Sequence, residues 1–264
     1  MTAEALVTKA IDERGVATLT LDRPERHNAF DEALISVLTS ALRDLGSDPS
    51  IRAVVLASNG RSFSAGADLE WMRRMASQSW SANLADAAAL GELMHTLDRL
   101  PKPTVALVQG AAYGGGVGLV ACCDVVVSST RASFCLSEVK LGLTPATISP
   151  YVVAAIGPRW ARRLFQTAES LSAERAREIG LVHDVVPEAD LAAAAEAILA
   201  NILQGAPGAQ AEAKDLAFLR EGRPIGADLL QETRERIARR RASDEGREGV
   251  TAFLEKRAPA WRQG

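Results

Sequence analysis

The sequence has few of the residues that mark specialised classes of protein. Only three of its 264 residues are Cys, 5% are aromatic, and no C-x-x-C pair is present. Cys122 and Cys123 are adjacent, so we expect neither a disulfide framework nor a structural zinc site. Lys and Arg number 30 against 33 Asp and Glu, so the chain has no overall positive charge that would favour nucleic acid as a partner.

Long apolar segments are also missing. No run of apolar residues approaches the roughly 18 that cross a bilayer. The N-terminal segment MTAEALVTKAIDERG lacks the basic and apolar regions of an export signal. We therefore expect a cytoplasmic protein with no membrane partner, and its 47% hydrophobic and 24% charged residues are typical of globular domains.

Apolar periodicity predicts a mixture of strands and helices. Residues 5–21 alternate apolar and polar positions on both sides of a turn at Gly15, which predicts a hairpin. Helical spacing runs over residues 31–45, with Gly46 as the expected C-terminal cap. Short apolar runs, typical of strands that are buried on both faces, occur at 53–57, 104–108 and 125–127.

Strands separated by helices in this way predict an α/β fold with catalytic loops after the carboxyl ends of the strands. Ser172 is expected to cap a helix that ends at Gly180, and a strand is expected at 181–186. Residues 189–202 are Ala-rich and helical in character. Residues 226–257 carry scattered apolar positions among many charges, which predicts a small helical domain or an oligomer interface.

Two loops rich in small residues follow two of the expected strands. Residues 63–69 read FSAGADL, and residues 109–119 read QGAAYGGGVGL. Such loops expose backbone N–H groups, and two converging N–H groups stabilise the oxyanion that develops on a carbonyl. Tight packing of strand against helix explains the same glycines equally well. A phosphate cradle is less well supported, because neither G-x-G-x-x-G nor G-x-x-x-x-G-K-[ST] is present.

A carboxylate close to such loops could move protons on and off carbon. Glu138 lies among mostly apolar neighbours in the segment LSEVKLG, and partial burial would raise its pKa toward that use. A solvated or ion-paired surface Glu fits the same pattern. Spacing alone does not choose between the two interpretations.

Other reactive residues form no recognisable constellation. Ser62 and Ser64 lack the G-x-S-x-G pattern of a hydrolase nucleophile. The three His residues lie far apart in the sequence, so a structural role is expected for each. Arg73 and Arg74 follow the first glycine loop, where they fit either an anionic ligand or a solvated helix face.

Several segments together resemble the enoyl-CoA hydratase/isomerase (crotonase) superfamily, in the same order and over nearly the whole chain. They are LDRP with NAF at 21–30, FSAGADL at 63–69, QGAAYGGGVGL at 109–119, ASF with SE at 132–138, GLV with VVP at 180–187, and FLEKR with Pro259 and Trp261 at the end. The resemblance implies an α/β fold, namely a crotonase-like spiral of ββα units followed by a C-terminal helical domain. We place the spiral core at residues 1–200 and the helical domain, which would serve oligomerisation and cover the active site, at 201–264. A homotrimer or homohexamer is also implied.

The same resemblance implies roles for individual residues. The backbone N–H groups of Ala67 and Gly115 would form an oxyanion hole for an acyl-CoA thioester, and Glu138 would be the general acid/base. Coenzyme A belongs to the substrate, so neither a separate cofactor nor a metal is implied. The residues implied to border CoA are Arg26 near its phosphates, Ala65, Gly66, Ala67, Asp68 and Leu69 near its adenine, and Phe253 and Lys256 from a neighbouring subunit.

One position departs from the two-glutamate hydratases of the superfamily. Their second carboxylate lies three residues after the oxyanion glycine, where this chain has Gly118. Residues three apart share a helix face, so we expect Gly118 to leave space empty beside the reacting atoms. One carboxylate suffices to shuttle a proton during double-bond migration, which favours an isomerase.

The amino-acid sequence of two long segments nevertheless resembles that of the bacterial methylglutaconyl-CoA hydratase branch, including relatives that act on isoprenoid-derived glutaconyl-CoA esters. These segments are GAAYGGGVGLVACCDVVV and LSEVKLGLTPATISPYVVAAIG. A glutaconyl substrate carries its own carboxylate, so its pocket should offer cations or hydrogen-bond donors. The candidates are Lys140, Arg73, Arg74, Tyr113 and Ser137, and Tyr113 or the substrate carboxylate could place water in the space at Gly118.

The sequence therefore leaves three hypotheses for function. The first is hydration of a branched 2-enoyl-CoA such as 3-methylglutaconyl-CoA, or the reverse dehydration, in leucine or isoprenoid breakdown. The second is an enoyl-CoA isomerase that uses Glu138 alone. The third is a protein that binds acyl-CoA without turnover.

Overall fold

A six-stranded sheet forms the centre of the fold. The computed structural model describes residues 6–219 and 222–262, so Ala5 of the expected hairpin lies outside the described residues. The strands of this sheet are Val7–Ile11 (β1), Val16–Leu21 (β2), Ala53–Ser58 (β3), Thr104–Val108 (β5), Val125–Ser129 (β7) and Asp184–Val186 (β10). Their order is β1-β2-β3-β5-β7-β10.

The pairing of these strands agrees with the sequence patterns. β1 and β2 form the expected antiparallel hairpin, and the other pairs are parallel. Gly15 in the hairpin turn has φ +79°, and a Cβ there would lie 2.3 Å from the carbonyl oxygen of Ser50, so this turn needs glycine. The strand expected at 181–186 is shorter, because the ladder to β7 begins only at Asp184. His183 just before it has a structural role, since its Nδ1 accepts a hydrogen bond from the Val126 amide at 3.0 Å.

The chain also forms a second sheet of very short strands, which alternate in the sequence with strands of the first. Its members are Ser62–Ser64 (β4), Ala111–Tyr113 (β6), Ser133–Cys135 (β8) and Leu171–Ser172 (β9), in the order β4-β6-β8-β9. Strands of two or three residues are too short for a periodic pattern to reveal them. β3, β5 and β7 are each followed by one strand of this second sheet and then by a helix, which confirms the expected repetition of ββα units.

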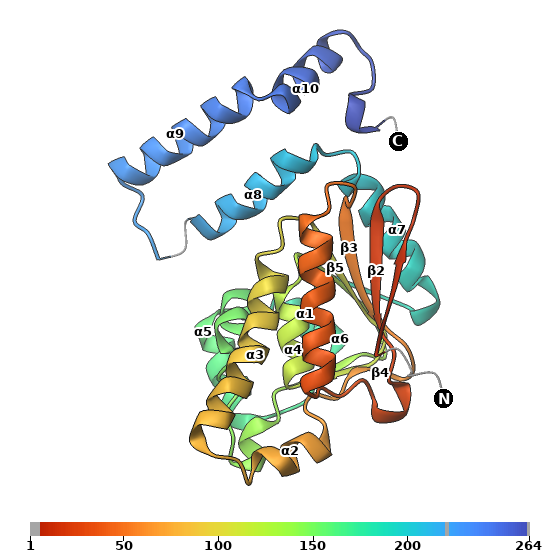
Figure 1. The fold of residues 1–264 in the computed structure, drawn as a ribbon, viewed down its shortest axis with the longest axis vertical. Coiled ribbons are helices and arrows are strands. Elements are labelled where there is room, and N and C mark those ends of the chain that lie inside the picture. The colour runs from red at the N-terminus through yellow and green to blue at the C-terminus, as the bar shows by residue number, and fades with distance from the viewer. Residues whose placement is uncertain (1–5, 220–221, 263–264) are drawn as a thin grey trace.

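Helices cover both faces of the six-stranded sheet (Figure 1). On one side lie α1, α3, α4 and α5, while Leu199 of α7 packs on the other side against Val16 and Val55. The helices up to this point are Glu32–Ser47 (α1), Leu69–Met75 (α2), Trp80–Asp98 (α3), Gly115–Cys122 (α4), Ser149–Thr167 (α5), Ala173–Glu178 (α6) and Leu191–Ile202 (α7).

α1 begins as expected but ends later. The Asp31 side chain caps it by accepting a hydrogen bond from the Leu34 amide. The prediction that Gly46 caps its C-terminus is wrong, because the helix continues through Ser47 and Gly46 lies inside it. A Cβ on Gly46 would lie 3.0 Å from Leu100 Cδ1, so the glycine provides room for packing.

The last three helices extend away from the sheet at one end of the molecule (Figure 1). They are Pro207–Leu219 (α8), Ala227–Ala242 (α9) and Asp244–Leu254 (α10), and the Ser243 side chain caps α10. α2 lies at the opposite end of the long axis. None of the helices in the described part of the chain has the length and apolar character needed to cross a membrane.

Candidate active site

The two loops of small residues meet at Gly66 and Gly114. A Cβ on Gly66 would lie only 2.9 Å from the carbonyl oxygen of Tyr113, and a Cβ on Gly114 would lie 3.9 Å from the Cα of Gly66. Both glycines also have positive φ values, +88° and +48°. Glycine is therefore required at this junction, both for the approach of the loops and for their backbone conformation.

Backbone N–H groups are free at this junction. The Phe30 amide donates to Gly66 O at 2.7 Å, and the Asp68 amide donates to Phe30 O at 2.8 Å. These bonds flank Ala67, so the N–H of Ala67 itself points away from Phe30. Gly115 is the first residue of α4, where an N–H has no acceptor within the helix. Within residues 6–219 and 222–262, neither amide donates to a protein acceptor, so both can bind an oxygen atom of a ligand.

The carboxylate of Glu138 lies against the same junction. Glu138 opens a short 3-10 helix, Glu138–Leu141 (η2), shortly after β8. Its Oε1 is 3.1 Å from the position that a Cβ of Gly114 would take, and its Oε2 is buried without a hydrogen-bond partner. Burial raises the pKa of this carboxyl above its ordinary value. The alternative of a solvated or ion-paired surface Glu is therefore wrong.

Asp68 and two arginines fix the first loop in place. The Asp68 carboxylate caps α2 through the amides of Glu70 and Trp71 at 2.9 and 3.2 Å. It also pairs with Arg26 at 3.1 Å and with Arg23 at 3.8 Å. Burial alone would raise the pKa of Asp68, but the two amides and the Arg26 guanidinium lower it below its ordinary value. The role of Arg23 was not predicted, because no local pattern connects it to Asp68, which lies far along the sequence.

The space at Gly118 is occupied, which corrects the expectation that it is empty. A Cβ on Gly118 would lie 2.4 Å from Ile148 Cγ2 and 3.1 Å from Met94 Cε. Ile148 precedes α5 and Met94 belongs to α3, and both side chains are buried. No spacing rule connects these residues to Gly118, because three separate elements bring them together. The structure thus leaves no room at Gly118 for the Cβ of a residue that would carry a second carboxylate.

The candidates for binding a substrate carboxylate have other partners or are exposed. The hydroxyl of Tyr113 is 3.3 Å from Ser133 Oγ, and Lys140 Nζ donates to the carbonyl oxygen of Ala168 at 2.8 Å. Arg74 pairs with Glu32 at 2.8 Å. Arg73 is exposed on α2, and Ser137 precedes η2.

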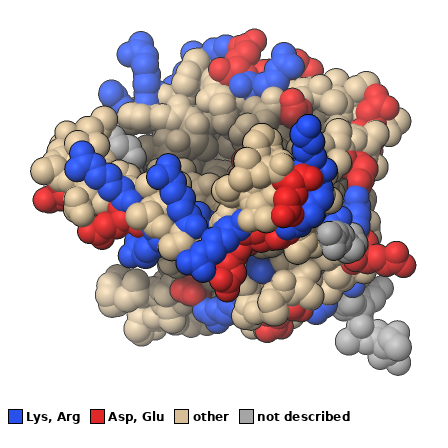
Figure 2. Space-filling model, turned by 90° about the horizontal axis from the view of Figure 1, so that it is seen from above, with Lys and Arg blue, Asp and Glu red and all other residues tan. Residues whose placement is uncertain are grey.

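Residues implied to border CoA fall into two groups in space. Arg26 and residues 65–69 lie together: the Ala65 amide donates to His27 O at 2.9 Å, and Leu69 begins α2. Phe253 lies in α10 and Lys256 shortly after it, and α10 lies at the opposite end of the molecule from α2 (Figure 1). Figure 2 views that far end, where Lys and Arg side chains project over a hollowed surface. The chain therefore does not bring Phe253 or Lys256 to its own 65–69 loop.

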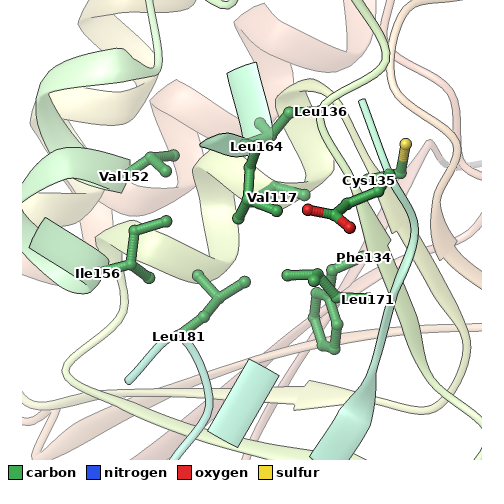
Figure 3. Close-up of a pocket in the computed structure, with 10 residues that line it drawn as sticks. Val117, Phe134, Cys135, Leu136, Val152, Ile156, Leu164, Leu171 and Leu181 are labelled. Carbon is green, nitrogen blue, oxygen red and sulfur yellow. The ribbon is translucent and has the colours of Figure 1, made fainter. Parts of the chain in front are cut away.

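A small apolar pocket lies between α4, α5 and β8 (Figure 3). Val152, Ile156 and Leu164 of α5 face Val117 of α4 and Phe134 of β8 across it. Phe134, Cys135 and Leu136 are buried, so the segment that leads to Glu138 is anchored in the core.

Comparisons with known proteins agree with this geometry. A model of the enoyl-CoA hydratase/isomerase family matches residues 12–264. The 2,3-dehydroadipyl-CoA hydratase of Escherichia coli is 34% identical over 251 residues, which cover 95% of this chain and 96% of the relative. The crystal structure of an enoyl-CoA hydratase from Shewanella pealeana is 47% identical, with a TM-score of 0.95 over 97% of this chain and 96% of that one. An enoyl-CoA hydratase from Mycobacterium smegmatis is 36% identical, with a TM-score of 0.92 over 98% and 100% of the two chains.

Together, the matched length and the shared fold show that this chain belongs to the enoyl-CoA hydratase/isomerase family and is an enzyme of the hydratase type.

Proposed function

We propose that this enzyme hydrates a branched 2-enoyl-CoA thioester, 3-methylglutaconyl-CoA or a related glutaconyl-CoA, to the 3-hydroxyacyl-CoA, or catalyses the reverse dehydration. The observation that carries the proposal is the position of the Glu138 carboxylate. It is partly buried, its Oε2 has no hydrogen-bond partner, and its Oε1 lies against Gly114, the residue before the free amide of Gly115. A carboxylate in this place can exchange a proton next to a carbonyl whose oxygen those amides hold.

In the proposed mechanism, the N–H groups of Ala67 and Gly115 bind the thioester oxygen. Negative charge grows on that oxygen when water adds to C3 of the substrate, and the two donors stabilise it. Glu138 in its ionised form accepts a proton from the water and delivers a proton to C2, so no net proton is gained or lost. Neither step requires a metal or a redox cofactor, and CoA enters only as part of the substrate.

A glutaconyl-type substrate fits the lack of a second carboxylate. Because Ile148 fills the place next to Gly118, water activation falls to Glu138 and to groups on the substrate. The named substrate of the E. coli relative, 2,3-dehydroadipyl-CoA, also carries a carboxylate at the far end of its acyl group. That parallel supports a dicarboxylic acyl group here. Arg73, Tyr113 and Ser137 remain our candidates for its recognition.

We further propose a homotrimer or a homohexamer in which neighbouring subunits complete each CoA site. The C-terminal helices and the segment before α9 expose large apolar side chains, which a partner subunit would cover. These residues are Ile225, Leu230, Ile237, Val250, Phe253 and Leu254. Phe253 and Lys256 of one subunit would then contact the CoA that lies on Arg26 and residues 65–69 of the next. We also propose that the protein is cytoplasmic.

Isomerisation of a 3-enoyl-CoA is the second candidate. The packing of Ile148 against Gly118 favours it, because this packing excludes a second carboxylate at position 118, and a single carboxylate suffices for a proton shuttle. The two reactions share Glu138 and the two amides. They differ only in whether water enters the product.

Turnover of three thioesters tests the proposal. Wild type and Glu138→Gln are incubated with 3-methylglutaconyl-CoA, crotonyl-CoA and a 3-enoyl-CoA, and the product masses are measured. We expect 3-methylglutaconyl-CoA to gain one water with wild type and to stay unchanged with Glu138→Gln. Reaction of the 3-enoyl-CoA alone, with no gain in mass, would replace hydration by isomerisation.

A further inference from the structure

The segment that carries Glu138 is packed into the core on one side only. Phe134, Cys135 and Leu136 before it are buried around the pocket in Figure 3. After it, no residue of η2 is buried, and Val139 and Leu141 are 37% and 60% exposed. Apolar packing therefore fixes where the segment starts but gives little support to the residues that follow Glu138.

Lys140 ties this exposed part to the end of α5. Its Nζ donates to the carbonyl oxygen of Ala168 at 2.8 Å. Ala168 follows the last residue of α5, has no exposed surface, and adopts a left-handed conformation with φ +46°. Its own amide donates to Leu164 O at 3.0 Å, which holds it in place. A helix C-terminus presents free carbonyl groups and a partial negative charge, so a lysine ammonium is well suited to this position.

The same carbonyl group links both sides of Glu138 to α5. Cys135 Sγ, three residues before Glu138, is 3.4 Å from Ala168 O, and Lys140 reaches it from two residues after. The Glu138 carboxylate has no comparable support, because its Oε2 is buried without a partner. Its position therefore depends on the backbone around it, which these two contacts hold together with the hydrogen bonds from the Gly114 amide to Cys135 O and from the Leu143 amide to Glu138 O.

We propose that Lys140 is a positioning residue for the hydration reaction: by binding Ala168 O, its ammonium holds η2 so that the Glu138 carboxylate stays against Gly114. The inference rests on the proposed function, because it takes Glu138 as the group that moves the proton. It also assigns Lys140 to the catalytic segment instead of to the substrate carboxylate.

Steady-state kinetics of Lys140→Met and Lys140→Arg test this role. Lys140→Met keeps the aliphatic stem but loses the donor. Since small misplacements of a catalytic group cost up to about 100-fold, we expect kcat to fall at least about tenfold for both crotonyl-CoA and 3-methylglutaconyl-CoA, with little change in KM. Lys140→Arg retains a donor and should recover most of kcat. Lys9→Met, on the exposed edge strand β1, is the matched control for loss of a lysine and should behave as wild type.

The pH profile and amide exchange separate positioning from a general loss of stability. In Lys140→Met, water reaches Glu138 more easily, so the acid limb of kcat/KM should move to lower pH. The amides of Lys140, Gly142 and Leu143, which bond within this segment, should exchange with deuterium faster, while those of β3 should not. A rise in KM confined to 3-methylglutaconyl-CoA would overturn the inference, because Lys140 would then bind the substrate carboxylate.

Failure of the inference and failure of the proposed function give different results. If wild type hydrates these thioesters and Lys140→Met matches it in kcat and in amide exchange, only the positioning role fails. If wild type converts none of the thioesters, the proposed function fails. Unchanged amide exchange in Lys140→Met would then also reject the role of the Lys140–Ala168 contact in holding η2, without reference to activity.

Discussion

A methyl group of Ile148 lies 2.4 Å from the point where a side chain at Gly118 would begin. Carbon atoms do not approach so closely without displacement, so these two positions share one volume. Any residue other than glycine at position 118 must displace the side chain of Ile148 or of Met94, and both of these side chains are buried. The absence of a second carboxylate is therefore built into the packing of α3, α4 and α5 and does not depend on residue 118 alone.

A double-mutant cycle on this pair should show strong coupling. Gly118→Ala overpacks the site, which costs about 1–3 kcal/mol, partly offset by about 0.5–1 kcal/mol from the better helix propensity of Ala. Ile148→Ala opens a cavity and costs about 2–5 kcal/mol. In the double variant, the new methyl occupies part of the cavity, so the free energy of unfolding should fall by less than the sum. Urea denaturation measures all four proteins, and strict additivity would contradict the shared volume.

The same crowding predicts the outcome of an attempt to restore two carboxylates. Gly118→Glu alone should be destabilised and should hydrate crotonyl-CoA no faster than wild type. Adding Ile148→Gly, which removes the clashing atoms, should recover part of the stability. A gain in hydration by Gly118→Glu alone would show that the place beside Gly118 is open to substrate.

The partly buried carboxylate of Glu138 should lower the free energy of unfolding as pH rises. Because its pKa is raised in the folded state, the folded protein keeps this proton at pH values where the unfolded chain has lost it. Stability therefore falls as pH rises above the ordinary carboxyl pKa, and the loss is complete above the folded-state pKa. Glu138→Gln should be more stable than wild type at neutral pH, and the difference should shrink toward pH 4.5. Thermal unfolding across pH measures this, with the exposed Glu174→Gln as control.

The close contact of the two loops makes Gly66 sensitive to a single methyl group. Gly66→Ala places a Cβ 2.9 Å from Tyr113 O, which should push the amides of Ala67 and Gly115 apart. Loss of one oxyanion donor costs about 2.7–4 kcal/mol, so kcat should fall about 100- to 1,000-fold. Gly222→Ala is a control, since Gly222 also has positive φ but has nothing within 4 Å of its Cβ position. It should lose some stability and no activity.

Mixed oligomers test whether neighbouring subunits share the CoA site. A Phe253→Ser/Lys256→Ala variant keeps Glu138, whereas Glu138→Gln keeps the C-terminal residues. If sites form between subunits, co-refolding of the two inactive proteins should restore activity, because some sites combine an intact Glu138 with an intact Phe253 and Lys256. Purified single variants are the controls. No recovery in hybrids of confirmed mixed composition would place both groups in one chain.

The sequence predicted correctly those elements whose structure is determined by residues close together in the chain. The hairpin at β1 and β2, the three apolar strands β3, β5 and β7, and the Ser172 cap follow from periodicity and capping, and the structure confirms them. The ββα repetition was reached by resemblance, because strands as short as β9 carry no periodic signal.

Only part of the site could be predicted from the sequence. The two glycine loops could be named because each follows an identifiable strand, and Glu138 could be named from its apolar neighbours and from the family resemblance. The filling of position 118 by Ile148 and the contact from Lys140 to Ala168 could not, because residues 28 to 30 apart meet only through the packing of whole helices. A glycine in a sequence does not indicate whether the space beside it is empty or filled.

Charged contacts, more than an apolar core, join the three C-terminal helices. Arg240 binds Glu212 of α8 and Glu245 of α10, and Glu245 also accepts the amides of Gly208 and Ala209 at the start of α8. Among the described residues of these three helices, only Leu229 of α9 and Ala252 of α10 are buried. Salt weakens the attraction between such partly exposed charged side chains, whereas it does not weaken apolar packing. Raised ionic strength should therefore loosen the packing of the three C-terminal helices before the sheet unfolds.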